Sequence, residues 1–174
     1  MKTFASAALK IKAVAQKVAD LYATDLDPQR SGFAVCLIIA RTRKELAENP
    51  TKVLRKLFVA NGREIPKGKG PRWLKLSQEK PQRAAGNERH VISRQSADPD
   101  PTADKFPGGI VYRYRGFWIG IGVSGLASAD DEAVAVLLAE YAGLIDERII
   151  ASILAAIGEN EPLRRLQEAY TRIL

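Results

Sequence analysis

Residues 106–143 read FPGGIVYRYRGFWIGIGVSGLASADDEAVAVLLAEYAG, and this stretch decides the fold. Apolar residues alternate with others over 110–114, and the alternation resumes after the turn residue Gly116, over 117–124. A period of two is typical of strands, and a glycine between two such runs indicates a hairpin. We therefore predict two antiparallel strands, followed by a helix that ends at Gly143.

Gly120 and Gly122 fall on one face of the second predicted strand, because side chains alternate between the two faces of a sheet. A strand that lacks side chains on one face permits close approach by a helix, a neighbouring subunit or a flat ligand. The sequence leaves these three alternatives open.

The helix after the hairpin begins with a serine and a group of acids. Ser128 and Asp131 match an S-x-x-D capping box, while Asp130 and Glu132 suit the positive end of a helix. The alternative is that the three carboxylates bind a metal or form a catalytic pair. Because a helix start already accounts for these residue types, we favour capping.

The N-terminal half predicts two helices and one strand. Apolar residues within Thr3–Tyr22 fit a single helical stripe. The apolar run Phe33–Ala40 predicts a strand that is buried on both faces and is therefore central in its sheet. Between Asn49 and Gly62, a cap, four apolar residues at helical spacing and a glycine stop predict a second helix.

Residues 63–94 form a basic segment, with nine cations against three carboxylates and with six prolines and glycines. This composition predicts an irregular, exposed segment. Trp73 and His90 interrupt the cations, a pattern that suits contact with nucleic acid or an acidic protein, the alternative being a solvated loop. Beyond it, His90–Ser93 predicts a short strand and Asp98–Pro101 a loop.

Two more helices are predicted at about 146–157 and 162–173, and they form a helical C-terminal extension at about 146–174. Their apolar residues exceed what a small helix needs for packing on one sheet. One interpretation is an oligomer interface, shared with the glycine face of the hairpin, in a purely structural subunit.

The length of 174 residues fits one domain, which we place at 1–174. Cys36 lies in an apolar run, where a thiol behaves as a small hydrophobe, and this favours an intracellular location. Lys10 and Lys12 interrupt any leader-like stretch, and no apolar run reaches the roughly 20 residues of a membrane span. We expect a cytoplasmic protein, and no catalytic-triad, zinc or phosphate-loop pattern favours an enzyme.

Three linked motifs carry a family resemblance. They are Phe106-Pro107-Gly108-Gly109-Ile110, then Gly120-Ile121-Gly122-Val123-Ser124-Gly125, then Asp130-Asp131-Glu132 at a helix start. In order and spacing they resemble the GlcG/HbpS-like haem-binding family. The resemblance implies an α+β fold, an α/β sandwich in which a mostly antiparallel sheet packs against helices. It also implies homo-oligomeric assembly and, in some members, haem as cofactor.

The chain departs from that family at two places. Where members continue the first strand into a hairpin, this chain has Arg41-Thr42-Arg43-Lys44, and we expect the hairpin to be absent. We also find no counterpart of the lysine-bearing helix with paired small residues that crosses the sheet, because the basic segment takes its place. The family's haem-ligating positions find no match in this chain.

Candidate ligand-binding residues come from the side-chain types that haem proteins use. His90 is the leading iron ligand, and Cys36, Tyr112 and Tyr114 are the other donors of suitable type. For each, the alternative is a purely structural role. Amides at Gly108-Gly109 suit a haem propionate or a tight turn equally. Phe106, Ser124 and Gly125, which belong to the resemblance motifs, complete the predicted cofactor-binding set.

The sequence thus favours a non-enzymatic small-ligand-binding protein, with haem as the candidate ligand, that acts as an oligomeric sensor, carrier or accessory subunit. Two alternatives stay open. The first is a nucleic-acid-binding or protein-interaction module that uses the basic segment. The second is a structural oligomer subunit.

Overall fold

The fold is built on an antiparallel sheet of four strands in the order β2-β1-β4-β3. A computed structural model describes residues 4–96 and 106–174. Its strands are β1 (Gly32–Ala40), β2 (Val53–Val59), β3 (Gly109–Tyr114) and β4 (Phe117–Ser124). The α+β prediction is confirmed, and β1 occupies an inner position with all nine residues buried, as its apolar run indicates.

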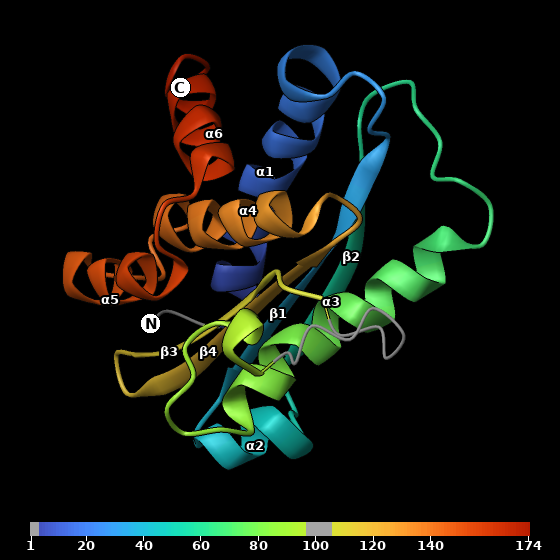
Figure 1. The fold of residues 1–174 in the computed structure, drawn as a ribbon. Helices are drawn as coiled ribbons and strands as arrows, with labels where there is room; N and C mark the ends of the chain where they lie inside the picture. Colours follow the sequence, from blue (N-terminus) through green and yellow to red (C-terminus); the bar gives the residue numbers. More distant parts are fainter. Residues whose placement is uncertain (1–3, 97–105) are drawn as a thin grey trace.

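Helices cover both faces of the sheet (Figure 1). One face carries α1 (Phe4–Leu21) and α4 (Ser128–Tyr141), with α6 (Glu161–Thr171) packed on α4. The other face carries α2 (Arg43–Glu48) and α3 (Lys69–Ala85). The remaining helix, α5 (Glu147–Ile157), follows α4 and lies near the β3 side of the sheet.

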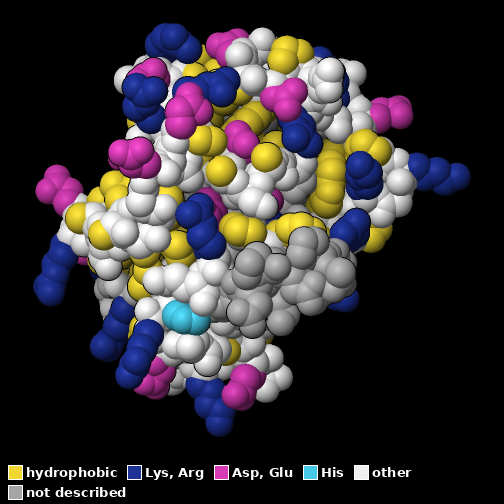
Figure 2. All heavy atoms as spheres, in the orientation of Figure 1, with side chains coloured by type: hydrophobic (Ala, Val, Ile, Leu, Met, Phe, Trp, Pro, Cys, Tyr) yellow, Lys and Arg dark blue, Asp and Glu magenta, His cyan; other side chains and the backbone are white. Residues whose placement is uncertain are grey.

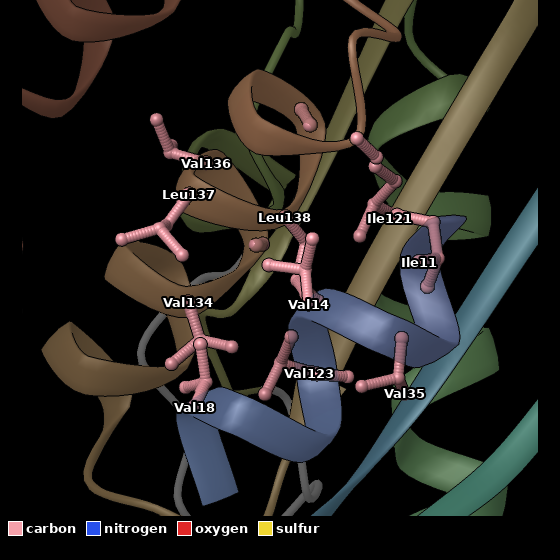
Figure 3. Close-up of a cluster of buried hydrophobic side chains, with 14 of the residues drawn as sticks. Ile11, Val14, Val18, Val35, Ile121, Val123, Val134, Val136, Leu137 and Leu138 are labelled. Atoms are coloured by element: carbon pink, nitrogen blue, oxygen red, sulfur yellow. The ribbon is translucent and has the colours of Figure 1, made fainter. Parts of the chain in front are cut away.

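The α4 helix is buried all round, because the sheet, α1 and α6 enclose it. Figure 3 shows Val134 of α4 facing Val14 and Val18 of α1, with Val123 of the sheet beside them. The C-terminal helices add Leu163, Leu166 and Tyr170 to the same buried cluster. Most of the apolar excess that we assigned to an oligomer interface therefore fills the core of this chain, and that interpretation is wrong for these residues.

The helix predicted between Asn49 and Gly62 is wrong, because this segment contains strand β2. Strand β2 pairs antiparallel with β1, and α2 lies in the connection between them. The first strand therefore does continue into an antiparallel partner, so our expectation that the hairpin is absent is also wrong. Leu54 and Phe58 join the main hydrophobic cluster, on the face of the sheet that α1 and α4 cover, whereas Val53 packs against the smaller cluster on the face that α2 and α3 cover. Successive side chains of a strand point to opposite faces, so the apolar pairs 53–54 and 57–58 each place one residue on either face. Their spacing of four residues also fits a helix, and this explains the wrong prediction.

The prediction of an irregular basic segment is wrong for residues 69–85, which form the helix α3 that crosses the sheet, whereas 63–68 and 86–91 contain no helix or strand. Its contact face uses small residues and a proline, among them Gly70, Ser77, Pro81 and Ala84. A helix that carries a buried lysine, Lys80, does cross the sheet, so the expectation that the chain has none is wrong. Glycines, prolines and a high share of charged residues are typical of loops, which explains why α3 escaped prediction.

The remaining elements follow the sequence with small changes. The first helix begins within the predicted range and continues into a π-helix, η1 (Tyr22–Leu26). The strand expected at His90–Ser93 is reduced to one bridge between Ile92 and Ile110, followed by a 3-10 helix, η2 (Ser93–Ser96). The loop at Asp98–Pro101 lies outside the described residues. Among the helices described, none is long and apolar enough to cross a membrane.

Candidate functional site

A cavity of about 310 Å³ lies between the N-terminal half of α3 and the junction of β4 with α4. We call it the α3–α4 cavity. Its wall contains four cationic side chains and one carboxylate, together with aromatic and small residues. The lining residues are Arg30, Lys69, Arg72, Trp73, Leu76, Lys80, Phe106, Ser124, Gly125, Leu126, Ala127, Ser128 and Asp131.

The floor of the cavity is an ion pair between Lys80 of α3 and Asp131 of α4. Their Nζ and Oδ2 atoms are 2.7 Å apart, and the two side chains are only 1% and 4% exposed. Lys80 Nζ also donates to the Val123 carbonyl at 2.6 Å, and Asp131 Oδ1 accepts from the Leu126 amide at 3.1 Å. The pair thus ties α3, β4 and α4 together at one point.

Burial opposes charge on both members of this pair. It raises the pKa of Asp131 to about 7, although Lys80 beside it acts in the opposite direction. Burial likewise lowers the pKa of Lys80, and Asp131 opposes that shift. Because both charged forms lose solvation, the energies of the ion pair and of the neutral pair approach each other.

Gly108 and Gly109 leave room at the start of β3 for Asp131 of α4 and Pro81 of α3, two helices that cover opposite faces of the sheet. A Cβ at Gly108 would lie 2.5 Å from the Asp131 Cβ, and one at Gly109 would lie 2.7 Å from the Pro81 nitrogen. The Gly109 amide donates to Ser93 Oγ at 2.9 Å, so it is not available to a propionate. Close approach therefore explains Gly109, and the propionate interpretation of this residue is wrong.

Another part of the cavity wall combines the Trp73 ring with three cationic side chains. A Cβ at Gly125 would lie 3.1 Å from the Trp73 ring, so the indole packs directly against the backbone after β4. Lys69 and Arg72 are exposed on the first turn of α3, and Arg30 is held by Asp27 at 2.9 Å. Lys69 and Arg72 leave the cavity with a surplus of positive charge, since Lys80 balances Asp131 and Asp27 balances Arg30.

The first turn of α4 adds backbone donors to the same wall. Ala127 is the N-cap of this helix and offers no side-chain acceptor to the first amides. The capping box predicted at Ser128 and Asp131 is therefore wrong, because the Asp131 carboxylate turns towards Lys80 and the Leu126 amide. Uncapped amides at a helix N-terminus need an acceptor from solvent or from a ligand.

The acidic trio at the start of α4 does not converge on one point. Each carboxylate has a partner from a different part of the chain. The pairs are Asp130 with the Tyr22 hydroxyl, Asp131 with Lys80, and Glu132 with Arg94. Within residues 4–96 and 106–174, no group of three His, Cys, Asp or Glu side chains is placed to hold a metal ion.

The structure brings together only part of the predicted cofactor-binding set. Phe106, Ser124 and Gly125 all line the α3–α4 cavity, and Gly108 lies against the ion pair at its floor. His90 follows the opposite end of α3, roughly 18 Å along the helix from the turn that carries Trp73, at 1.5 Å per residue. Its carbonyl accepts a hydrogen bond from Arg43.

The other donor candidates lie outside this cavity. Tyr112 lines a second hollow, of about 510 Å³, between β3 and α5, and burial raises the pKa of its hydroxyl. Burial also raises the pKa of the Cys36 thiol to about 12, as expected for a core cysteine. Tyr114 is half-buried beneath the Arg115 guanidinium, 5.2 Å from the ring centre. For Cys36 and Tyr114 these placements agree with structural roles, whereas the buried Tyr112 hydroxyl has no hydrogen-bond partner among the described residues.

Sequence reasoning missed Lys80, Trp73 and Arg30 as members of one site. A usable signal was present for Lys80, because it lies between Ser77 and Ala84 at helical spacing. A lysine among small residues on one helical face cannot reach solvent easily when that face packs on a sheet, and it then requires a buried acceptor. No comparable local pattern connects Arg30 to α3.

No family model matches the chain, and comparison with curated proteins and with solved structures finds no significant relative. The GlcG/HbpS-like resemblance accordingly stays a prediction. The described lining of the α3–α4 cavity contains no histidine, cysteine, methionine or tyrosine, the usual iron ligands of haem proteins. These residues therefore fit a small anion better than an iron-ligated haem.

Proposed function

We propose that the protein binds a small organic anion in the α3–α4 cavity. The observation that carries this proposal is the charge of the wall, where Lys69 and Arg72 add positive charge while Lys80 balances Asp131 and Asp27 balances Arg30. An anion that enters would gain charge-assisted hydrogen bonds, which are about twice as strong as neutral ones. The uncapped amides of α4 would add to this attraction.

The remaining lining residues indicate the shape of the ligand. Trp73, Leu76 and Phe106 offer an apolar surface beside the cations. A volume of about 310 Å³ lies at the lower end of the range for small-molecule sites. We therefore propose a compact ligand that joins a carboxylate or phosphate group to an apolar or aromatic part.

Trp73 fluorescence provides a direct test. In a Trp118→Phe background, Trp73 is the single tryptophan, and the protein is titrated with benzoate and with inorganic phosphate. We expect a saturable change, and Arg72→Gln should raise the Kd roughly tenfold, the loss of one charge-assisted hydrogen bond. Arg164→Gln, on the exposed side of α6, is the matched control. A linear response, or equal effects of both substitutions, would overturn the proposal.

Haem is the second candidate ligand, supported by the sequence resemblance and by the meeting of Phe106, Ser124 and Gly125 in one cavity. A haemin titration followed by the Soret absorbance tests it. Saturable binding that His90→Ala abolishes would support His90 as the ligand. Binding that Arg72→Gln weakens and His90→Ala does not would place haem in the α3–α4 cavity without this ligand. Weak, unsaturable absorbance would remove haem from consideration.

Homo-oligomeric assembly, as a sensor, carrier or accessory subunit, is a further proposal that rests on the resemblance alone. Light scattering distinguishes the 19.1 kDa chain from its multiples. A mass that is a fixed multiple at all concentrations supports assembly. A mass of one chain, with or without the anion, contradicts it.

A further inference from the structure

The positive charge of the molecule is concentrated on one stretch of its surface. Between residues 52 and 75 there are eight cations and one carboxylate, a surplus of seven that equals the formal net charge of +7 of the whole chain. All eight are exposed. We call this set the basic surface; its members are Lys52, Arg55, Lys56, Arg63, Lys67, Lys69, Arg72 and Lys75.

This surface is not the basic segment that the sequence predicts at 63–94. Of the four later cations of that segment, Arg89 is exposed, whereas Lys80 is buried against Asp131 and Arg94 pairs with Glu132. Arg83 donates to the Phe106 carbonyl at 2.9 Å. The exposed charge instead extends in the opposite direction, onto β2, which sequence reasoning had not included.

The cations of the basic surface follow one edge of the fold, with Arg55 and Lys56 of β2 on opposite faces of the sheet. Strand β2 is at the edge of the sheet and spans about 20 Å, at roughly 3.3 Å per residue. The first turn of α3 packs beside it, because a Cβ at Gly70 would lie 3.0 Å from the Leu57 side chain. The loop between β2 and α3 joins the two elements, and dark blue side chains project around it at the right-hand side of Figure 2.

The chemistry of this surface selects among anionic partners. The large hydrophobic residues that are exposed on the described chain are Leu9, Leu154, Ile173 and Leu174, and none belongs to this stretch. Protein interfaces have an apolar core, and membrane-surface helices insert an apolar face. A phosphate backbone needs only cations, arranged over a length of several nucleotides.

We propose that the basic surface binds the phosphate backbone of a nucleic acid, without reading its sequence. This site is separate from the anion site in its residues, apart from Lys69 and Arg72 at the rim that both share. The two proposals can therefore fail independently. Binding through phosphates releases counterions, so the affinity must fall steeply as salt rises.

The test is fluorescence anisotropy with a labelled RNA strand of about 20 nucleotides and a DNA duplex of about 20 base pairs, at salt from about 50 to 200 mM. Arg55→Gln, Lys56→Gln, Lys67→Gln and Lys75→Gln are combined in one variant that leaves the α3–α4 cavity intact. The matched control combines Lys10→Gln, Lys17→Gln, Arg164→Gln and Arg172→Gln, which removes the same charge from exposed positions elsewhere.

We expect at least one probe to bind with a log–log salt slope of about −3 or steeper, as for four or more phosphate contacts. The first variant should bind at least about tenfold more weakly, with the control within about threefold of the original protein. Circular dichroism confirms that both variants are folded, and retained benzoate binding by the first variant shows that the cavity is intact.

Three results would overturn the proposal. No binding of either probe at about 50 mM salt is the first. The second is an equal loss in both variants, which would mean that net charge alone attracts the probe. The third is self-association of the first variant without any nucleic-acid binding by the original protein, since cations on an edge strand also prevent strands from pairing between molecules. Binding to vesicles rich in phosphatidylserine, with neither nucleic acid bound, would assign the surface to membranes instead.

Discussion

At the scale of single residues, Lys80 and Asp131 connect the fold to the candidate site. Their side chains join α3 to α4 across 51 positions of sequence, and they form the floor of the α3–α4 cavity. A buried ion pair contributes little net stability, because desolvation offsets the attraction, but loss of one member leaves a buried charge without its partner. Replacement of one member of the pair should therefore destabilise the fold more than replacement of both.

Lys80→Met should lower the free energy of unfolding by about 3 to 5 kcal/mol, because Asp131 would stay buried without a cation. The double variant Lys80→Met/Asp131→Leu should recover much of that loss. Urea denaturation measures all three proteins. Lys75→Met is the control, since Lys75 is exposed and its contact with Glu79 is 3.6 Å; its cost should be below about 1 kcal/mol. Equal costs for Lys80→Met and Lys75→Met would contradict a buried pair.

The raised pKa of Asp131, about 7, predicts a pH dependence. The folded protein keeps a proton that the unfolded chain releases above a pH of about 4, so the contribution of this carboxyl to stability is lost as pH rises towards about 7. The difference in free energy of unfolding between the protein and Asp131→Asn should thus narrow over this range. A difference that widens with pH would show that Lys80 holds the pKa of Asp131 below its ordinary value.

At the scale of elements, the contact between α3 and β4 determines how the sheet is covered. The glycine face of β4 receives α3, so the helix alternative is confirmed, and neither a flat ligand nor a neighbouring subunit occupies this face. A Cβ at Gly122 would lie 1.9 Å from the Ser77 carbonyl oxygen. The backbone of the helix and the backbone of the strand are thus closer than any side chain allows.

Gly122→Ala should cost more than about 3 kcal/mol, because backbone atoms on both sides must move. Gly86→Ala is the matched control, with an ordinary helical backbone and 3.4 Å between the new Cβ and the Arg83 carbonyl oxygen. Its stability should change by less than about 1 kcal/mol, because alanine also restricts the unfolded chain. Thermal unfolding of the two variants compares them directly. Similar melting temperatures would mean that α3 lies farther from the sheet.

The helix caps give a second prediction at this scale. The Asp146 side chain accepts from the Ile149 amide at 3.0 Å at the start of α5, so Asp146→Ala should cost about 1 kcal/mol. Ser128→Ala should cost less than about 0.5 kcal/mol, because the side chain of Ser128 does not cap α4. Chemical denaturation resolves the difference. A cost for Ser128→Ala as large as that for Asp146→Ala would restore the capping box.

At the scale of the whole molecule, one hydrophobic cluster extends from Ala7 in α1 to Tyr170 in α6. The predicted C-terminal extension is therefore integrated into the main core through α6. Charge is distributed less evenly than apolar surface, because the basic surface carries a surplus equal to the net charge of the chain. The basic surface thus lies outside the buried cluster that stabilises the fold, whereas the α3–α4 cavity includes the buried Lys80–Asp131 pair.

A shared core predicts a single cooperative unfolding transition. Tryptophan fluorescence, which reports mainly on α3 and β4, and far-ultraviolet circular dichroism should give the same denaturation midpoint. Leu166→Ala, fully buried on α6, should lower both midpoints together, at a cost of about 2 to 5 kcal/mol. Leu154→Ala, on an exposed position of α5, should cost less than about 1 kcal/mol. Two separate midpoints would instead identify the extension as an independent unit.

The amino-acid sequence alone was sufficient to predict the elements in which apolar residues recur at a regular local spacing. The alternation over 110–124 predicts β3 and β4, the apolar run of β1 predicts a central strand, and apolar stripes predict α1, α4 and the last two helices. The same stretches supplied Phe106, Ser124 and Gly125, which do meet in one cavity. Local periodicity is sufficient here because each element buries one continuous apolar face.

The tertiary structure was needed to establish β2, α3 and the composition of the candidate site. An edge strand with apolar residues on both faces has a spacing like that of a helix, and a helix rich in charge, glycine and proline resembles a loop in sequence. The fate of a charge likewise depends on residues far along the chain: Lys80 is buried because Asp131 is opposite, whereas Lys67 and Lys75 remain exposed. A charged side chain can be buried only beside a partner that compensates for its lost solvation, and the tertiary fold determines which residue is that partner.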